Sequence, residues 1–354
     1  MITKISVGKR NEKYDVLIGK EVCSKKNFQK FITKEQKILL LFDKNVPIKK
    51  IALIKKQLNS LGAKVYNYAI TPGEQSKSIR NFENIHNFLS KNSFLRSDGI
   101  VACGGGVVGD LGGFVASTYM RGISYIQVPT TLLSQVDSSI GGKTAINLSS
   151  GKNLVGSFYN PKGVLIDTNF LDSLGEREYK SGLAEIIKHA LIADRAFANY
   201  LLQHSKNILK RDSDYLRHII TKSINIKAKI VTRDHKEQGI RAFLNFGHTI
   251  GHALEHAFKS KLLHGEAVAY GMDYEAKMSL KTLNLCQDDY DFVKEILKTY
   301  GFECKLNITF EKLKPFIKID KKNSANTVNL VQLNKIGSCE MVPIKNINSL
   351  KKFF

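Results

Sequence analysis

Short apolar runs of β type alternate with helical patterns through the first 170 residues, and this alternation constrains the fold more than any other feature. Helical periodicities near 48–61 and 77–91 separate the first three runs. Strands that alternate with helices predict a parallel sheet with helices on its faces. The runs are KILLLFD at 37–43, KVYNYAI at 64–70, GIVACGGG at 99–106, SYIQVPT at 124–130 and GVLIDT at 163–168.

Beyond about residue 172 the β-type runs nearly vanish and helical periodicities take their place. A chain of 354 residues is long enough for two domains. We therefore predict an α/β domain over residues 1–170 and an all-α domain over residues 171–354, with a ligand site in the cleft between them. The helical periodicities cover 181–204, 213–231, 243–259, 265–283 and 288–300.

The composition indicates a globular protein with an unusual charge. Hydrophobic residues make up 43% of the chain and charged residues 24%, which excludes a disordered tail, a collagen-like fibre and a coiled-coil rod. The formal net charge of +22 would suit a nucleic-acid partner. However, only ten of the 54 basic residues are arginines, the residue favoured for base and phosphate recognition, and the lysines are spread along the whole chain. We therefore expect no nucleic-acid partner.

No segment predicts secretion or a membrane location. The longest apolar stretches fall short of the roughly 18 residues that a membrane span needs, and no apolar run follows the opening MITKISVGKR. The five cysteines are isolated, without a CxxC pair, which predicts free thiols in a reducing compartment. We expect a cytoplasmic protein without a membrane partner.

A glycine-rich turn at 104–109 predicts a phosphate-binding site. GGGVVG satisfies G-x-G-x-x-G, follows a predicted strand and opens a helical pattern, as dinucleotide binding requires. Glycines let the backbone approach a pyrophosphate, whose charge the N–H groups at the helix start then meet. The acidic residue usual about 20 positions later is absent, and Asp43, at the end of LLLFD, is the candidate for the ribose. A purely structural glycine turn is the alternative.

Residues 129–153, PTTLLSQVDSSIGGKTAINLSSGKN, are dense in hydroxyls and glycines, with two lysines and Asp137 among them. Such a stretch builds poor core, but it offers many donors on a flexible backbone for phosphates and sugar hydroxyls. A surface loop is the alternative.

A histidine cluster in RAFLNFGHTIGHALEHAF predicts a metal site. Arg241, Asn245, His248, His252 and Glu255 follow one another at steps of four, three, four and three, which predicts that they share one helix face. His248, His252, His256 and His264 fall within 17 residues. Histidines one helical turn apart can bind one metal ion, and a carboxylate from elsewhere would complete a catalytic site.

Glu185 is the candidate carboxylate, because it lies with Lys188 in the largely apolar SGLAEIIKHALI. Burying both is costly unless they are paired or ligate a metal ion. An ordinary ion pair of Glu185 with Lys188 or His189 is equally compatible with the spacing. Glu266, in HGEA, is either a charge at a helix N-terminus or a site residue.

Taken together, these motifs resemble those of the 3-dehydroquinate synthases, a family of sugar-phosphate cyclases. The resemblance runs from about residue 37 to 337. It implies a Rossmann-like, dinucleotide-binding α/β domain followed by a helical, metal-binding domain, in a homodimer. The blocks that carry it are PGEQSKS (72–78), GGGVVGDLGGF (104–114), QVPTTLLSQVDSSIGGKTAIN (from 127), GKNLVGSFYNP (151–161), SGLAEIIKH, LNFGHTIGHALEH and LLHGEAVAYGM (262–272).

The resemblance also implies site residues. For zinc, with cobalt as an alternative, it implies the ligands Glu185, His248 and His264, and it leaves His252 as a catalytic residue. For NAD it implies Asp43, Glu74, Lys77, Gly105, Gly106, Val107, Asp110, Thr130, Thr131, Lys143, Lys152 and Ser173, with Leu174 beside them. For the substrate it implies Asp137, Lys143, Lys152, Asn153, Lys188, Lys227, Arg241 and Asn245.

The phosphate contact is implied less specifically. Either Lys321 or Lys322 of the DKK at 320–322 would hold the phosphate, and Arg121 would reach it across a dimer interface. Four positions depart from the family pattern. Ser173 stands where threonine is usual and His189 where an aromatic residue is common. Gly175 stands where proline is common, and His235 where a carboxylate is frequent.

The implied reaction converts 3-deoxy-D-arabino-heptulosonate 7-phosphate to 3-dehydroquinate and phosphate, a step of the shikimate pathway. NAD takes a hydride from an alcohol polarised by zinc, phosphate is eliminated, the hydride returns, and an intramolecular aldol addition closes the ring. The site lysines and Arg241 suit a small sugar phosphate that also carries a carboxylate. The alternatives are another sugar-phosphate cyclase and a metal-dependent polyol dehydrogenase, which would release NADH.

Overall fold

The computed structural model describes residues 2–9, 12–258, 261–303, 306, 308–319 and 327–354. The chain forms two compact units, an N-terminal unit, Met1–Leu174, and a C-terminal unit, Gly175–Phe354. The predicted fold class, an α/β part followed by a helical part, is confirmed. The functional domains 1–170 and 171–354 stay a prediction.

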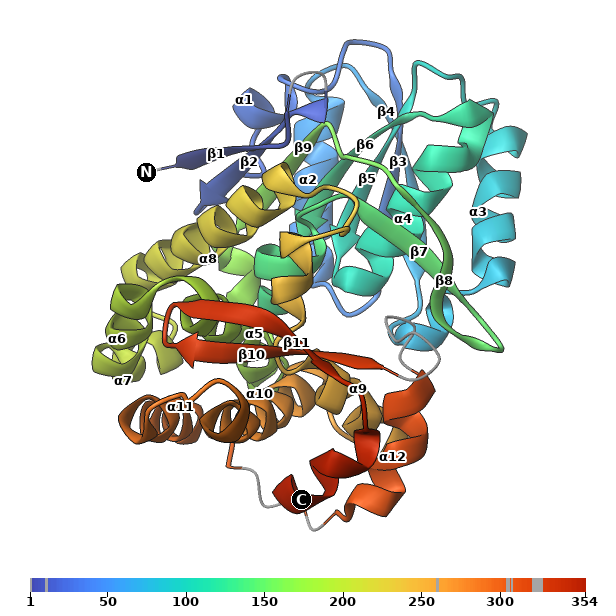
Figure 1. Ribbon diagram of the computed structural model, residues 1–354. Helices are drawn as coiled ribbons and strands as arrows, with labels where there is room; N and C mark the ends of the chain where they lie inside the picture. Colours follow the sequence, from blue (N-terminus) through green and yellow to red (C-terminus); the bar gives the residue numbers. More distant parts are fainter. Residues whose placement is uncertain (1, 10–11, 259–260, 304–305, 307, 320–326) are drawn as a thin grey trace. The chain divides into compact units, whose positions relative to one another are not determined.

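The N-terminal unit is built on a seven-stranded sheet (Figure 1). Its strand order is β1-β2-β9-β6-β5-β3-β4, and every neighbouring pair is parallel except β1 and β2. The five predicted strands are confirmed, whereas the sequence pattern does not predict the edge hairpin β1–β2. The strands are β1 (Thr3–Val7), β2 (Tyr14–Gly19), β3 (Lys37–Asp43), β4 (Lys64–Ile70), β5 (Gly99–Gly104), β6 (Ser124–Pro129) and β9 (Gly163–Asp167).

Helices cover both faces of this sheet, and β3 shows why. Ile38 and Leu40 pack in one hydrophobic cluster with α2, whereas Leu39 and Leu41 pack in another with α3 and α4. Successive side chains of a strand point to opposite faces, so an unbroken apolar run needs cover on both sides. The helices are α1 (Lys25–Phe28), α2 (Ile48–Asn59), α3 (Ile79–Lys91) and α4 (Gly106–Thr118).

The segment 129–153 is structured, so the alternative of a surface loop is wrong, whereas the binding of phosphates or sugar hydroxyls by this segment stays a prediction. It contains a π-helical turn, Ser134–Ser138, and then enters a hairpin of β7 (Lys143–Leu148) and β8 (Gly151–Phe158). Alternate residues of β7, Thr144 and Ile146, are buried. The abundant glycines and serines hide this two-residue period in the sequence.

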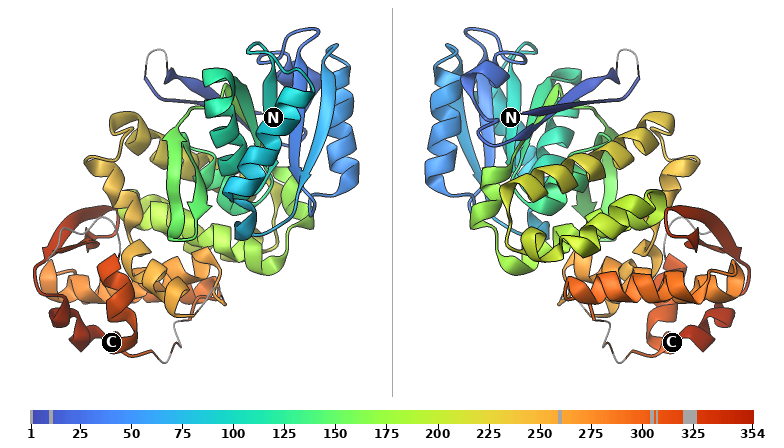
Figure 2. Two further views of the ribbon diagram at one scale, coloured as in Figure 1. Left: turned by 90° about the vertical axis from the view of Figure 1, so that its right-hand side faces the viewer. Right: turned by 90° about the vertical axis from the view of Figure 1, so that its left-hand side faces the viewer.

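The C-terminal unit is mainly helical, as predicted, and also contains a hairpin of β10 and β11 that the pattern does not predict (red in Figure 2). The predicted helix 181–204 is divided at Asp194, whose side chain caps α6 by accepting the N–H of Phe197. The elements are α5 (Glu176–Ala193), α6 (Arg195–Gln203), α7 (Ser205–Leu209), α8 (Ser213–Arg233), α9 (His248–Ala257), α10 (His264–Thr282), α11 (Gln287–Thr299), α12 (Phe310–Ile319), β10 (Val328–Lys335) and β11 (Ser338–Ile344).

The predicted helix 243–259 is wrong in its first part. Residues Ile240–Asn245 form a separate 3₁₀ segment, and α9 begins only at His248. Between them Gly247 has a φ of 78°, a left-handed conformation that glycine adopts without strain. A Cβ there would lie 2.6 Å from the carbonyl oxygen of Val268. The single helix face predicted for Arg241 through Glu255 therefore does not exist.

None of the helices in the described ranges combines the length and apolarity needed to cross a membrane.

Candidate metal centre and nucleotide-binding turn

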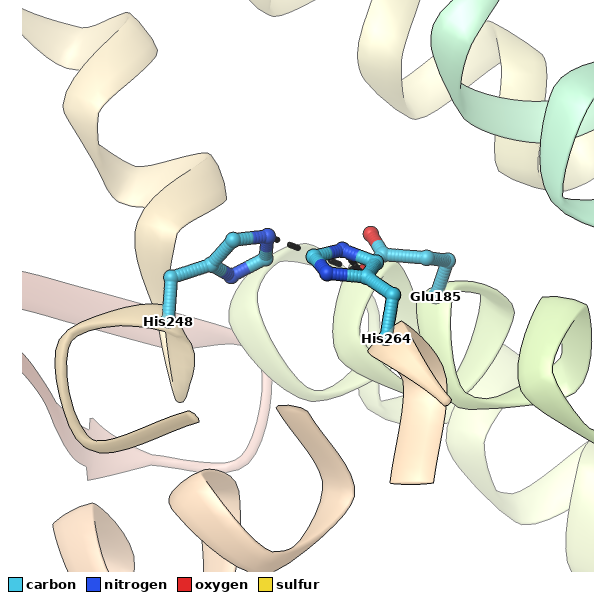
Figure 3. A group of neighbouring side chains, drawn as sticks. All are labelled: Glu185, His248 and His264. Carbon is cyan, nitrogen blue, oxygen red and sulfur yellow. Dashed lines mark ion pairs between the residues drawn. The ribbon is translucent and has the colours of Figure 1, made fainter. Parts of the chain in front are cut away.

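Three side chains from three helices of the C-terminal unit converge on one point (Figure 3). Glu185 comes from α5, His248 is the first residue of α9, and His264 is the first residue of α10. The Nε2 atoms of His248 and His264 lie 3.7 Å and 3.6 Å from Glu185 Oε1. One ligand atom from each of the three residues falls within 4.8 Å of the others, which is the arrangement that a metal ion needs.

Close backbone contacts at glycines bring these helices together. The start of α10 lies directly on α5, because the N–H of Gly265 donates to Ser181 Oγ over 3.0 Å. A Cβ at Gly265 would collide with the carbonyl oxygen of Ser181. A Cβ at Gly251 of α9 would lie only 3.0 Å from the carbonyl oxygen of Ala267 on α10. These residues let the ligand-bearing helix ends approach one another.

The Glu185 carboxylate is fully buried and shared between two kinds of partner. Oε2 accepts a hydrogen bond from Lys188 Nζ, whose side chain is also buried. Oε1 has no hydrogen-bond donor among the described residues and faces the two histidines. Burial would raise the pKa of the Glu185 carboxyl, but Lys188 and the two histidines outweigh it and hold the pKa well below its usual range. The sequence spacing is compatible with either an ion pair or a metal site at Glu185. In the structure, Oε2 forms the ion pair with Lys188 and Oε1 is placed to bind a metal ion.

The two histidines differ in their surroundings. Burial and the nearby Lys188 hold the pKa of His248 well below its usual range. Burial would also lower the pKa of His264, but the carboxylates of Glu185 and Glu255 raise it to about 10. Metal ions bind neutral imidazole and displace its proton. A buried carboxylate oxygen that faces two histidine Nε2 atoms therefore fits a divalent cation such as zinc or cobalt.

His252 and Glu255 line the same region of α9. The ring of His252 lies 5.4 Å from that of His248 and 6.0 Å from that of His264, measured between centroids. Glu255 Oε2 lies 3.6 Å from Nδ1 of His264, on the side of the ring away from Glu185. The sequence places Glu255 near the cluster but gives it no role.

Other residues predicted for the site have distinct partners. Lys227 of α8 and Arg241 are buried. Arg241 donates to the carbonyl oxygen of His235, and Asn245 donates to Glu237 Oε1 over 3.0 Å. Glu266 accepts the N–H of Leu263 and pairs with Arg177, so that it is a charge at a helix N-terminus. Lys321 and Lys322 lie outside the described residues.

The glycine turn of the N-terminal unit has the predicted strand–turn–helix context. β5 ends at Gly104, Gly105 is the N-cap of α4, and Gly106 and Val107 open that helix. Asp43 ends the neighbouring strand β3, and a Cβ at Gly104 would lie 3.3 Å from the Asp43 Cβ. The backbone turn and the carboxylate thus lie together at the carboxyl edge of a parallel sheet, where such folds bind ligands.

A buried lysine, Lys77, contacts three other residues predicted for NAD or the substrate. Lys77 Nζ donates to Asp110 Oδ2 over 2.7 Å and to Asn153 Oδ1, and it lies 3.6 Å from Glu74 Oε1. Burial raises the pKa of Asp110 despite this lysine. Asn147, which the motifs do not single out, joins the group, since its amide donates to Glu74 Oε1 over 2.9 Å.

The remaining predicted residues of this unit lie in several different elements. Thr130 donates its N–H to the carbonyl oxygen of Gly104 over 2.9 Å, and Thr131 hydrogen-bonds with Ser134. The others are Asp137 in the π-helical turn, Lys143 at the start of β7, Lys152 in β8, Ser173 at the end of a 3₁₀ segment, and Leu174 after it.

Comparison with known sequences gives matches over most of the chain. Residues 67–181 match the family model of the 3-dehydroquinate synthase N-terminal region, and residues 182–323 match that of the C-terminal region. A 3-dehydroquinate synthase of Pelagibacter ubique is 40% identical over 351 residues, which cover 95% of this chain and 94% of that protein. One of Dictyoglomus turgidum is 47% identical over 272 residues, 76% of each chain.

Solved structures show the same fold. A 2-deoxy-scyllo-inosose synthase complexed with carbaglucose-6-phosphate, NAD⁺ and Co²⁺ aligns with a TM-score of 0.90 at 24% identity, over 99% of this chain and 100% of that one. The 2-epi-5-epi-valiolone synthase of Streptomyces hygroscopicus, with NAD⁺ and Zn²⁺ bound, aligns with a TM-score of 0.88 at 22% identity, over 99% and 98%. An iron-containing alcohol dehydrogenase aligns with a TM-score of 0.66 at 14% identity, over 96% of each chain.

Proposed function

The chain belongs to the 3-dehydroquinate synthase family, and on this premise we propose that it converts 3-deoxy-D-arabino-heptulosonate 7-phosphate to 3-dehydroquinate and inorganic phosphate. The observation that carries the proposal is the identity of 40% to a named 3-dehydroquinate synthase over 95% of the chain. The reaction makes the chain a carbon–oxygen lyase that acts on a phosphate, and we propose that it works in the cytoplasm.

Under this proposal NAD binds at the glycine turn of the α/β domain, residues 1–170. The support is the approach that Gly105 and Gly106 leave for a pyrophosphate at the start of α4, with Asp43 next to it. Two structures of the same fold carry NAD⁺. Bound NAD supplies the hydride acceptor.

The metal ion, zinc or cobalt, is held by Glu185, His248 and His264 of the helical domain, residues 171–354. The support is the buried Glu185 Oε1, which both histidine Nε2 atoms face. The bound ion supplies a Lewis acid for a substrate hydroxyl.

The chain's own residues then bind the substrate and move protons. Lys143, Lys152, Lys188, Lys227 and Arg241 offer positive charge for a carboxylate and a phosphate. The ring of His252 lies beside those of the ligands without being one of them, which suits proton transfer. Asn153, Asn245 and Asp137 supply the hydrogen bonds that orient the substrate hydroxyls.

A turnover assay tests the proposed function. Purified protein with zinc, the heptulosonate phosphate and NAD far below the substrate concentration is expected to release phosphate in many-fold excess over NAD, because each hydride returns within the turnover. NADH absorbance at steady state is expected to stay low, and a chelator is expected to stop the release. Phosphate and NADH are measured in the same sample.

Two other outcomes of this assay would contradict the proposal. NADH that accumulates in proportion to turnover with a polyol would indicate a dehydrogenase, which shares the fold at a TM-score of 0.66. Phosphate release from a hexose phosphate, but not from the heptulosonate, would indicate the chemistry of the inosose or valiolone synthases.

We also propose that the chain forms a homodimer through β8. In the described part of the chain, β8 pairs only with β7, so its outer edge has no strand partner. Leu154, Val155 and Phe158 on this strand are 37%, 38% and 45% exposed. Unpaired edges and apolar patches favour association with another chain. Arg121 lies near this strand. The next residue, Gly122, is so close to Tyr159, which follows β8, that a Cβ on Gly122 would lie 3.2 Å from the Tyr159 hydroxyl.

Val155→Asp is expected to shift the protein from dimer to monomer, because it places a charge in the apolar contact of both copies. Light scattering coupled to gel filtration measures the mass. Ile48→Asp is the matched control, since Ile48 is 70% exposed but lies on α2. A Val155→Asp protein that stays dimeric, or an Ile48→Asp protein that dissociates, would contradict the assignment of β8.

A further inference from the structure

We infer that Glu275 is a positioning residue for the metal ligand His248, an inference that rests on the metal centre proposed above. Glu275 lies on α10, its side chain is fully buried, and its Oε2 accepts the N–H of Gly247 over 2.7 Å. Gly247 immediately precedes His248 and is the N-cap of α9. The carboxylate thus reaches from one ligand-bearing helix to the backbone that presents the next ligand.

The Gly247 peptide needs such a partner. The N–H groups at the start of a helix have no acceptor within the helix. A buried N–H without an acceptor destabilises the folded state. Glu275 supplies the acceptor, and it thereby favours the left-handed conformation of Gly247, with a φ of 78°, over other conformations of this corner.

A second contact involves the carbonyl group of the same residue, Gly247, which belongs to the next peptide. Gly271 lies one turn before Glu275 on α10, and a Cβ at Gly271 would collide with the carbonyl oxygen of Gly247. The turn at Phe246 and Gly247 therefore contacts α10 twice. The Gly247 carbonyl group packs against Gly271, and the Gly247 N–H is hydrogen-bonded to Glu275. Because α10 begins with His264, the position of His248 relative to the second histidine ligand is set through one helix.

The same corner also sets the orientation of the imidazole ring. Nδ1 of His248 lies 3.2 Å from the carbonyl oxygen of Phe246, the residue before Gly247. When Nδ1 donates to this carbonyl, Nε2 is the unprotonated nitrogen that can bind a metal ion. Nε2 is the atom that lies 3.7 Å from Glu185 Oε1. A shift of residues 246–247 would thus move both the ring and its hydrogen-bond partner.

A positioning role and a merely structural one have different consequences. A structural carboxylate stabilises the metal-free and the metal-loaded protein equally, and metal affinity does not depend on it. A positioning carboxylate changes the metal affinity and the geometry around the ion. Replacing groups that orient metal ligands typically weakens metal affinity about 10- to 100-fold.

The test compares the wild type with Glu275→Ala, Glu275→Gln and Asp273→Asn. The dissociation constant for Co²⁺ is measured by competition with a chelator, the visible spectrum of the Co²⁺-loaded protein reports ligand geometry, and the melting temperature is measured without metal. We expect Glu275→Ala to weaken Co²⁺ binding about 10- to 100-fold and to alter the cobalt bands. Glu275→Gln is expected to recover most of the affinity, because its amide oxygen can accept the Gly247 N–H.

Asp273→Asn is the matched control. Asp273 lies on the same helix, but its Oδ1 accepts from the hydroxyl of Tyr290 over 3.3 Å, and cobalt binding is expected to equal that of the wild type. If Glu275→Ala lowers only the melting temperature and keeps the wild-type affinity and spectrum, Glu275 is structural and the inference is overturned. If Glu275→Ala does not fold, Glu275→Asp takes its place, because it withdraws the carboxylate by one methylene, and wild-type affinity there would overturn the inference equally.

Failure of the proposed metal centre gives a different result. In that case the wild type binds no Co²⁺ at one site per chain, or His248→Ala binds it as tightly as the wild type does. If the wild type binds Co²⁺, His248→Ala does not, and Glu275→Ala binds it as tightly as the wild type, the proposed metal centre is supported and only the positioning role of Glu275 is overturned.

Discussion

His248→Ala is expected to lose the bound metal ion and the activity together. Two of three ligands remain, and the buried Glu185 Oε1 then faces only one histidine. A Lewis acid supplies several kcal/mol of transition-state stabilisation, and about 4 kcal/mol corresponds to about 1000-fold in rate. We therefore expect zinc content near zero after dialysis and a fall in kcat of at least about 1000-fold. Metal analysis and the phosphate-release assay measure the two quantities on the same sample.

Two other histidines of α9 serve as controls for this variant. His256 stacks on Phe316, with ring centroids 5.6 Å apart, and His256→Ala is expected to keep both zinc and activity. His252→Ala is expected to keep zinc and to lose rate, because it removes a proton-transfer group but no ligand. A zinc-loaded His248→Ala protein together with a zinc-free His252→Ala protein would exchange the roles that we assign to these residues.

The sequence predicts the elements whose pattern is local. Each predicted apolar run of the central sheet becomes a strand, because burial on both faces of a sheet requires an unbroken apolar run. The run LLLFD ends, as predicted, with Asp43 at the carboxyl end of β3. In the hairpins β7–β8 and β10–β11, the strands β8 and β11 escape prediction because they are partly exposed and their alternation is weak. Their positions depend on neighbours far away in the sequence.

The site shows the same division between local and tertiary information. The spacing of His248 and His252 indicates a cluster, because one helical turn separates them. The same spacing wrongly predicts that the helix extends back to Arg241. The chain turns at Gly247 instead, and the left-handed conformation of Gly247 depends on contacts with α10 that the spacing does not show. Glu275 carries no signal in the sequence, because only the packing of α10 on α9 brings its carboxylate to the Gly247 N–H.

The largest effect on stability is expected for Glu185→Gln, measured in the absence of metal. The substitution keeps the shape of the side chain but leaves the buried ammonium of Lys188 without its carboxylate. Breaking a buried ion pair from one side typically costs about 3–5 kcal/mol, because the remaining charge stays out of water. We expect the free energy of unfolding in urea to fall by about this amount, and zinc binding to be lost as well.

The double variant Glu185→Gln, Lys188→Met separates the two roles of this carboxylate. Removing both charges is expected to restore most of the stability, since replacing a buried pair with apolar atoms is often neutral, whereas zinc stays lost. Glu176→Gln is the control on the same helix, because Glu176 pairs with Lys180 at 2.8 Å but is 77% exposed, and its urea midpoint should not move. Unchanged zinc affinity in Glu185→Gln would leave the carboxylate as an ion-pair partner alone. An unchanged urea midpoint in Glu185→Gln would contradict the predicted loss of stability. It would mean that the Lys188 ammonium reaches water when its partner is removed. The ion pair would then not be what keeps Lys188 buried beside the two histidines.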